Sequence, residues 1–65
     1  MTELKQYLEE RGIKHIWLAQ RAHLRDDTLS RIINGLHPSI DQAHSIAQVL
    51  NESLDRFWPG LFRNE

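Results

Sequence analysis

Apolar residues recur at helical spacing in five short stretches of this chain, and glycine, proline or asparagine separates most of them. In the first stretch Leu4, Tyr7 and Leu8 fall on one helical face before Gly12, and the fourth stretch follows Pro38. No run of useful length alternates as a half-buried strand does. Because glycine and proline end helices, the chain is restricted to a set of short helices.

The expected helices cover residues 2–11, 14–22, 26–34, 39–50 and 53–58. Thr2, Ser39 and Ser53 are suitable N-caps, and Asn34-Gly35 is expected to end the third helix in left-handed backbone. In the fourth helix the residues expected to point inward are Ile40, Ala43, Ile46, Ala47 and Leu50. Connections of two to four residues predict a compact all-α fold, and 65 residues predict one domain, residues 1–65.

The charge is distributed unevenly although the net charge is only −1. From Arg11 to His37 there are five basic and two acidic residues, a net charge of +3, whereas the rest of the chain has three basic and seven acidic residues, a net charge of −4. Three of the four histidines also lie in the basic segment. A basic middle between acidic ends indicates an anionic partner for the middle segment.

Several classes of function are disfavoured. The chain has no cysteine for a disulfide or thiolate zinc site, and its histidines are spaced by eight, fourteen and seven residues, not by the three or four that pair ligands on a helix. We therefore expect no metal site and no cofactor. No serine is spaced from a histidine and an acid as a nucleophile would be, so we expect no enzyme. No apolar run could cross a bilayer, and Glu3, Glu9 and Glu10 argue against a signal peptide, so we expect no membrane partner and a cytoplasmic location.

The second and third expected helices are joined by a short turn near Ala22-His23-Leu24-Arg25, which is a helix-turn-helix arrangement. A larger pattern surrounds it, made of Gly12, Leu18-Ala19, Leu24, Thr28-Leu29-Ser30-Arg31-Ile32, Asn34-Gly35, Pro38-Ser39, Ile46-Ala47, Leu50 and Ser53-Leu54. In this pattern the chain resembles the phage repressor/Cro-like, or XRE-type, helix-turn-helix family over about residues 3–58. Its Phe57-Trp58-Pro59 ending is similar to that of the phage Ner-like regulators.

The resemblance implies a lambda-repressor-like fold and a sequence-specific DNA-binding transcriptional regulator that acts as a dimer on duplex DNA, with helix 26–34 in the major groove. The positions that it assigns to base contacts are Asp26, Asp27, Thr28 and Arg31. Arginine can bind guanine bidentately, threonine can contact a thymine methyl, and a carboxylate can accept from cytosine. The positions that it assigns to phosphate contacts are Lys14, His15, Arg25, Asn34 and His37.

The chain also departs from the family pattern. His15 stands where glutamine is frequent, and His23 stands where the turn usually has glycine, so His23 must adopt positive φ or change the turn. Asp26 and Asp27 replace neutral or basic residues at the start of the recognition helix. These two carboxylates either face cytosines or serve only to cap the helix, as aspartate often does in a first turn.

Hydrophobic residues at usually polar positions suggest a different function. Ile16, Trp17 and Ile33 are such residues, and Trp17 is a candidate for a dimer or partner surface together with Leu61 and Phe62. Phe57 and Trp58 are expected instead to close the small core. The alternative function is a protein-interaction module on the same fold, such as an antirepressor, inhibitor or antitoxin-like partner, with little or no DNA binding.

Overall fold

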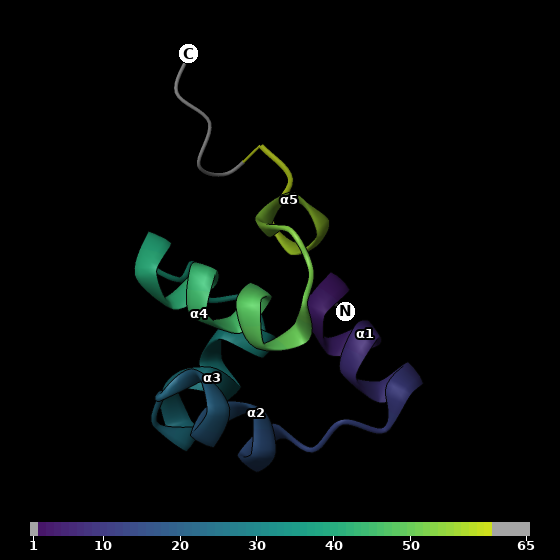
Figure 1. The fold of residues 1–65 in the computed structure, drawn as a ribbon, viewed down its shortest axis with the longest axis vertical. Helices are drawn as coiled ribbons and strands as arrows, with labels where there is room; N and C mark the ends of the chain where they lie inside the picture. Colours follow the sequence, from purple (N-terminus) through teal and green to yellow (C-terminus); the bar gives the residue numbers. More distant parts are fainter. Residues whose placement is uncertain (1, 61–65) are drawn as a thin grey trace.

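All five expected stretches form helices. In the computed structural model, which describes residues 2–60, the helices are α1 (Glu3–Arg11), α2 (His15–Ala22), α3 (Asp26–Ile33), α4 (Ile40–Leu50) and α5 (Leu54–Phe57). Residues 2–60 contain no strand, so the predicted all-α, five-helix fold is confirmed (Figure 1).

Hydroxyl side chains start two of the helices. The Thr2 hydroxyl accepts a hydrogen bond from the Lys5 N–H at 3.1 Å. At α4 the Ser39 hydroxyl accepts from the Gln42 N–H at 3.2 Å, while Gln42 Oε1 accepts from the Ser39 N–H at 2.9 Å. This reciprocal pair is a capping box, which satisfies two backbone donors at the helix start. Ser53 occupies the same position before α5 but makes no side-chain capping bond.

Left-handed residues end three of the helices. Gly12 follows α1 with a φ of 66°, His23 follows α2 with a φ of 59°, and Asn51 follows α4 with a φ of 57°. The end of α3 differs from the expectation, because Asn34 keeps a φ of −92° and only Gly35 has a positive φ, 118°. Asn34 donates its N–H to the Ser30 carbonyl at 3.1 Å, and the left-handed turn of the backbone comes one residue later, at Gly35.

The core lies where one face of every helix meets its neighbours. Its members with exposed fractions of 2% or less on α1 to α4 are Leu4, Leu8, Leu18, Ala19, Leu29, Ile32, Ile33, Ala43 and Ile46. The small residues Ala19 and Ala43 let α2 and α4 approach closely. The prediction that Ile40 points inward is wrong, since its side chain is 56% exposed. Side chains lean toward a helix's N-terminus, so a side chain on the first residue of α4 extends past the helix end.

A polar and aromatic cluster joins α1 to α5 and to Glu52 just before it. We call Tyr7, Arg11, Glu52, Arg56 and Phe57 the Tyr7 clasp. The Tyr7 ring meets Phe57 edge-on at 5.1 Å between centroids, and its hydroxyl donates to Glu52 Oε2 at 3.0 Å. The guanidinium carbons of Arg11 and Arg56 lie 3.8 Å and 5.0 Å from the Tyr7 ring centroid. Burial raises the pKa of the Tyr7 hydroxyl, and the hydrogen bond to Glu52 raises it further.

The clasp holds α5 against α1 and leaves α2 and α3 at the opposite end of the long axis (Figure 1). Phe57 is buried and Trp58 is partly buried against the core, which matches the expectation that these residues close it. Within residues 2–60 no helix is long and apolar enough to cross a membrane.

Candidate nucleic-acid interface

The turn between α2 and α3 has three residues, His23, Leu24 and Arg25. His23 adopts left-handed backbone, with φ 59° and ψ 41°, and its N–H approaches the Ala19 and Gln20 carbonyls. The Leu24 N–H donates to the Ala19 carbonyl at 2.8 Å, and the Leu24 side chain packs partly buried against the core. His23 therefore performs the backbone role expected of glycine, at a cost of about 1 kcal/mol for a non-glycine residue.

α3 has one buried face and one exposed face. Leu29, Ile32 and Ile33 are buried, which anchors the helix on the core. Of the four predicted base-contacting residues, Asp26, Asp27 and Arg31 are exposed, whereas Thr28 is only partly exposed.

Sequence reasoning did not include Ser30 in the site, although its side chain is also exposed on α3. Its spacing could have indicated this, because Ser30 lies four residues after Asp26, three after Asp27 and four before Asn34, on the same face of the helix. The Asn34 side-chain amide donates to the Ser30 carbonyl at 2.8 Å, so this predicted phosphate contact is held against the end of α3.

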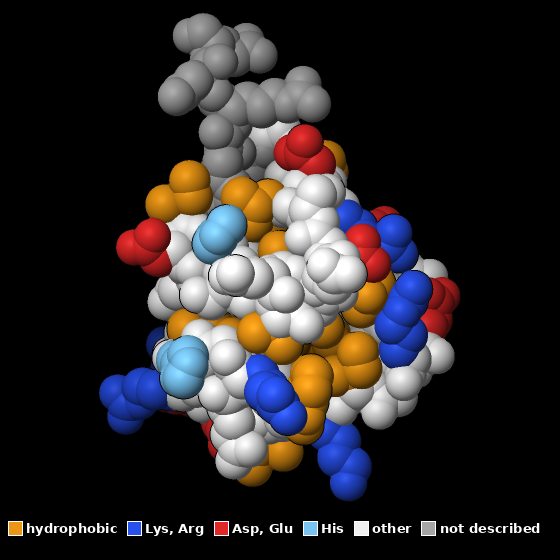
Figure 2. Space-filling view, viewed as in Figure 1, with side chains coloured by type: hydrophobic (Ala, Val, Ile, Leu, Met, Phe, Trp, Pro, Cys, Tyr) orange, Lys and Arg blue, Asp and Glu red, His pale blue; other side chains and the backbone are white. Residues whose placement is uncertain are grey.

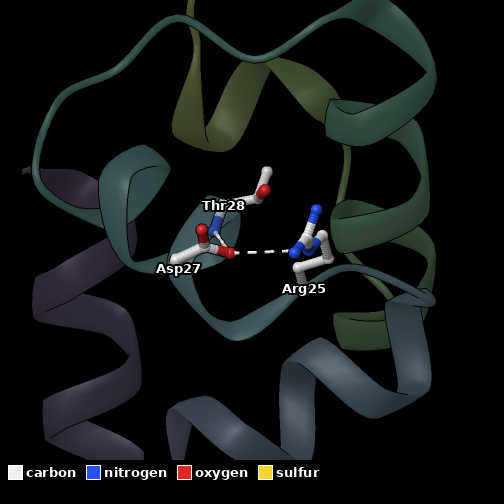
Figure 3. Close-up of polar contacts among 3 residues, drawn as sticks. All are labelled: Arg25, Asp27 and Thr28. Carbon is white, nitrogen blue, oxygen red and sulfur yellow. Dashed lines mark hydrogen bonds and ion pairs between the residues drawn. The ribbon is translucent and has the colours of Figure 1, made fainter.

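A short chain of polar contacts organises the start of α3. Asp27 Oδ1 accepts the Thr28 N–H at 2.9 Å and lies 3.9 Å from Arg25 Nε (Figure 3). Both contacts use the same carboxylate oxygen. Both side chains are largely exposed, 87% for Arg25 and 65% for Asp27, so water screens the ion pair and its contribution to stability is small. Asp26 makes no comparable ion pair within residues 2–60.

The predicted phosphate contacts lie at helix ends and in loops. Lys14 is the N-cap residue of α2 and His15 is its first residue. Arg25 precedes α3, Asn34 follows it, and His37 lies in the loop before α4. All five side chains are exposed. α2 begins without a side-chain cap and without an acidic residue in its first turn, so its backbone N–H groups and dipole favour an anion there.

The predicted partner surface is only partly supported by exposure. Ile16 is 53% and Trp17 is 41% exposed, whereas Ile33 is fully buried and cannot contact a partner. Ile33 also belongs to the last turn of α3, and the Thr2 hydroxyl donates to its carbonyl, which ties α1 to α3. Leu61 and Phe62 lie outside the described residues.

The described part of the chain contains no group of three or more histidine, cysteine, aspartate or glutamate residues that could hold a metal ion. A depression of about 620 Å³ lies between α4 and α5, where Glu52 and Asp55 contribute carboxylates. The α3 face therefore remains the strongest candidate site, because its geometry suits a surface interaction with the groove of a duplex.

Comparison with protein families agrees with this geometry. The family model described as helix-turn-helix matches residues 4–57, most of the chain, from α1 to the end of α5. Searches of curated proteins and of solved structures gave no match.

Proposed function

Since the chain belongs to the XRE-type helix-turn-helix family of DNA-binding regulators, we propose that it is a sequence-specific transcriptional regulator of the repressor/Cro type. In this proposal α3 lies in the major groove of duplex DNA, and α2 crosses the phosphate backbone. The proposal includes a cytoplasmic location and requires neither a cofactor nor catalysis.

The observation that carries the proposal is the division of α3 into two faces. Leu29 and Ile33 are fully buried, while Asp27 is exposed together with Ser30 and Arg31, which lie three and four residues after it. A helix anchored along one side by core residues and held by a three-residue turn can present the other side rigidly to base edges. This rigidity favours base recognition, because poorly held side chains would lose entropy on binding.

The proposed base contacts come from the start and middle of α3. Arg31 binds guanine O6 and N7, and Thr28 contacts a thymine methyl. Asp26 and Asp27 accept from cytosine amino groups. Asp27 can do so through Oδ2, because its Oδ1 is engaged by the Thr28 N–H and Arg25. These residues decide which sequence is preferred.

The proposed phosphate contacts supply affinity more than sequence preference. They are Lys14, His15, Arg25, Asn34 and His37. We also propose a homodimer that binds two half-sites about 34 Å apart, as helix-turn-helix dimers do. Leu61 and Phe62 remain the proposed dimer residues.

The proposal is tested by binding selection on random duplexes, followed by titrations of the selected duplex at several salt concentrations. Arg31→Ala should relax preference at one base pair and weaken the selected site by about 1–3 kcal/mol. Lys14→Ala should weaken all sequences alike and reduce the salt slope by about one. Arg56→Ala is the matched control, because it removes the same charge at the α5 end of the molecule.

Two outcomes would contradict DNA binding through α3. One is the absence of duplex affinity even at low salt. The other is equal loss for Arg31→Ala and Arg56→Ala, which would mean that net charge matters and the α3 face does not.

The acidic start of α3 favours a second candidate, a protein-interaction module on the same fold with little or no DNA binding. Asp26 and Asp27 would repel phosphates, and the exposed Ile16 and Trp17 offer apolar area to a protein. In that case Trp17→Ala would abolish a protein complex, and no duplex would be selected. A tight operator, with Trp17→Ala harmless to every assembly, would exclude this candidate.

A further inference from the structure

One surface of α2 is apolar and plays no part in the proposed reading of bases. We call Ile13, Ile16 and Trp17 the α2 apolar patch. Ile16 is 53% and Trp17 is 41% exposed, while Ile13 is partly buried against the core. Beside Ile13 and Trp17 lies an open depression of about 350 Å³, lined by Gly12, Ile13, Lys14 and Trp17, and Ile16 directly precedes Trp17 on α2 outside this lining. Neighbouring exposed apolar residues around a hollow are typical of an interaction site.

The charged residues that α2 and its N-cap contribute beside this patch, Lys14 and Arg21, are both positive. Lys14 precedes Trp17 by three residues and Arg21 follows it by four, so the three lie along one face of α2. The guanidinium carbon of Arg21 lies 5.2 Å from the Trp17 ring centroid. Between Arg11 and Arg25 the sequence has no acidic residue. Over α2, in the lower part of Figure 2, hydrophobic and basic side chains lie next to one another.

We propose that the α2 apolar patch binds an acidic amphipathic helix of another protein. An apolar side chain of that helix fills the depression beside Trp17, and its carboxylates pair with Lys14 and Arg21. Amphipathic helices bind grooves through residues at such helical spacing. Tryptophan and arginine are the residues that most often dominate the energy of such interfaces.

The chemistry of the patch favours a protein over a nucleic acid. Phosphates and sugars offer no aliphatic group of the size of this depression, and thymine methyls lie in the groove, where the proposal above places α3. Contact with the backbone alone would leave Ile16 and Trp17 without an apolar partner. Lys14 lines the depression and is also a proposed phosphate contact, so the variants tested below leave Lys14 unchanged.

The same chemistry favours another protein over a second copy of this chain. Elsewhere in the part of the chain that the structure describes, the exposed large hydrophobic residues are Leu36 and Ile40. Of the residues that directly follow these two in the sequence, only Asp41, after Ile40, is acidic. A second copy would thus bring a single adjacent carboxylate to two cations, whereas an acidic helix brings several.

The experiment uses the full chain and a display library of random 16-residue peptides, counter-selected on the Ile16→Ala variant. We expect the recovered peptides to be enriched in aspartate and glutamate with leucine, phenylalanine or tryptophan at helical spacing. A synthetic peptide of the recovered sequence is then titrated by fluorescence anisotropy. Ile16→Ala should weaken it by about fivefold or more, and Arg21→Gln by about threefold, from lost apolar area and lost charge.

Ile40→Ala is the matched control, because Ile40 is 56% exposed and lies on α4, outside the patch. The loss of peptide affinity in Ile40→Ala should be at least threefold smaller than the loss in Ile16→Ala. Thermal melts of all three variants verify that each is folded, and Arg21→Gln retains every apolar contact of the patch should Ile16→Ala melt early.

Four results would overturn the proposal. The first is recovery of basic or uncharged peptides, and the second is no enrichment of peptides on the parent chain over the Ile16→Ala variant. The third is an equal loss of peptide affinity in Ile16→Ala and Ile40→Ala. The fourth is self-association of the chain in sedimentation that Ile16→Ala abolishes. The last result would assign the patch to a second copy. None of these measurements requires DNA binding, so failure of the proposed regulator function would leave the test intact.

Discussion

At the scale of single residues, His23 shows how the fold tolerates strain at the turn. Its φ of 59° is a conformation in which a Cβ is disfavoured, and its side chain is exposed. His23→Gly should therefore stabilise the protein, by up to about 1 kcal/mol, because glycine adopts this backbone without the steric penalty. Chemical denaturation of the variant and the parent measures the difference in free energy of unfolding.

Asn51→Gly is the comparison for this prediction. Asn51 ends α4 with nearly the same φ, 57°, but asparagine tolerates left-handed backbone better than histidine. Its gain should be the smaller of the two. A larger gain for Asn51→Gly, or a loss for His23→Gly, would mean that the His23 side chain contributes contacts that outweigh its backbone strain.

Asp27 offers a second test at the residue scale. Asp27→Asn removes a charge that repels phosphates and also releases Arg25, whereas Asp26→Asn removes only the charge. Non-specific duplex affinity at low salt should rise in both variants, by about threefold for Asp26→Asn and more for Asp27→Asn. Anisotropy titrations with a random duplex measure both. Equal gains would show that the Arg25 contact has no effect on binding.

At the scale of helices, caps and core residues act together. The capping box at the start of α4 satisfies two backbone donors, while Ser53 makes no capping bond at α5. Ser39→Ala should lower the free energy of unfolding by about 1 kcal/mol. Ser53→Ala should lower it by clearly less, which makes it a matched control. If the two losses were equal in urea denaturation, the Ser39 hydroxyl would be contributing nothing specific to α4.

At the scale of the whole molecule, the Tyr7 clasp connects α1 to the region after α4. Burial raises the pKa of Tyr7 above its ordinary value of 10.0, and the hydrogen bond to Glu52 raises it further. The unfolded chain therefore loses this proton at lower pH than the folded protein. The stabilisation is complete below pH 10 and is lost as the pH rises through the raised pKa of the folded state.

The measurement for the clasp is the free energy of unfolding from pH 8 to pH 11. Tyr7→Phe should lose about 1 kcal/mol at pH 8, because the hydrogen bond to Glu52 is removed. It should also show a shallower decline above pH 10 than the parent protein. Parallel pH profiles for the two proteins would mean that Tyr7 does not link its ionisation to folding.

Much of the architecture was determined by the sequence, because its causes are local. Helix periodicity and the placement of Thr2, Gly12 and Ser39 indicated where helices begin and end, since capping and left-handed ends depend on neighbouring residues alone. For His23 the family pattern left two alternatives, a positive φ or a changed turn, and the structure has the positive φ. The exposure of Ile16 and Trp17 also followed, from their place beside the core residues Leu18 and Ala19.

Only the tertiary structure decided which apolar residues are covered and where side chains point. Ile33 is buried although its position in the family is usually polar, and Ile40 is exposed because it is the first residue of α4 and its side chain extends past the helix end. The Tyr7 clasp joins residues 45 apart in the chain, and the shared Oδ1 of Asp27 depends on rotamers. The clasp arises from the packing of several elements at once and the Asp27 contacts from side-chain rotamers, and spacing along one helix specifies neither.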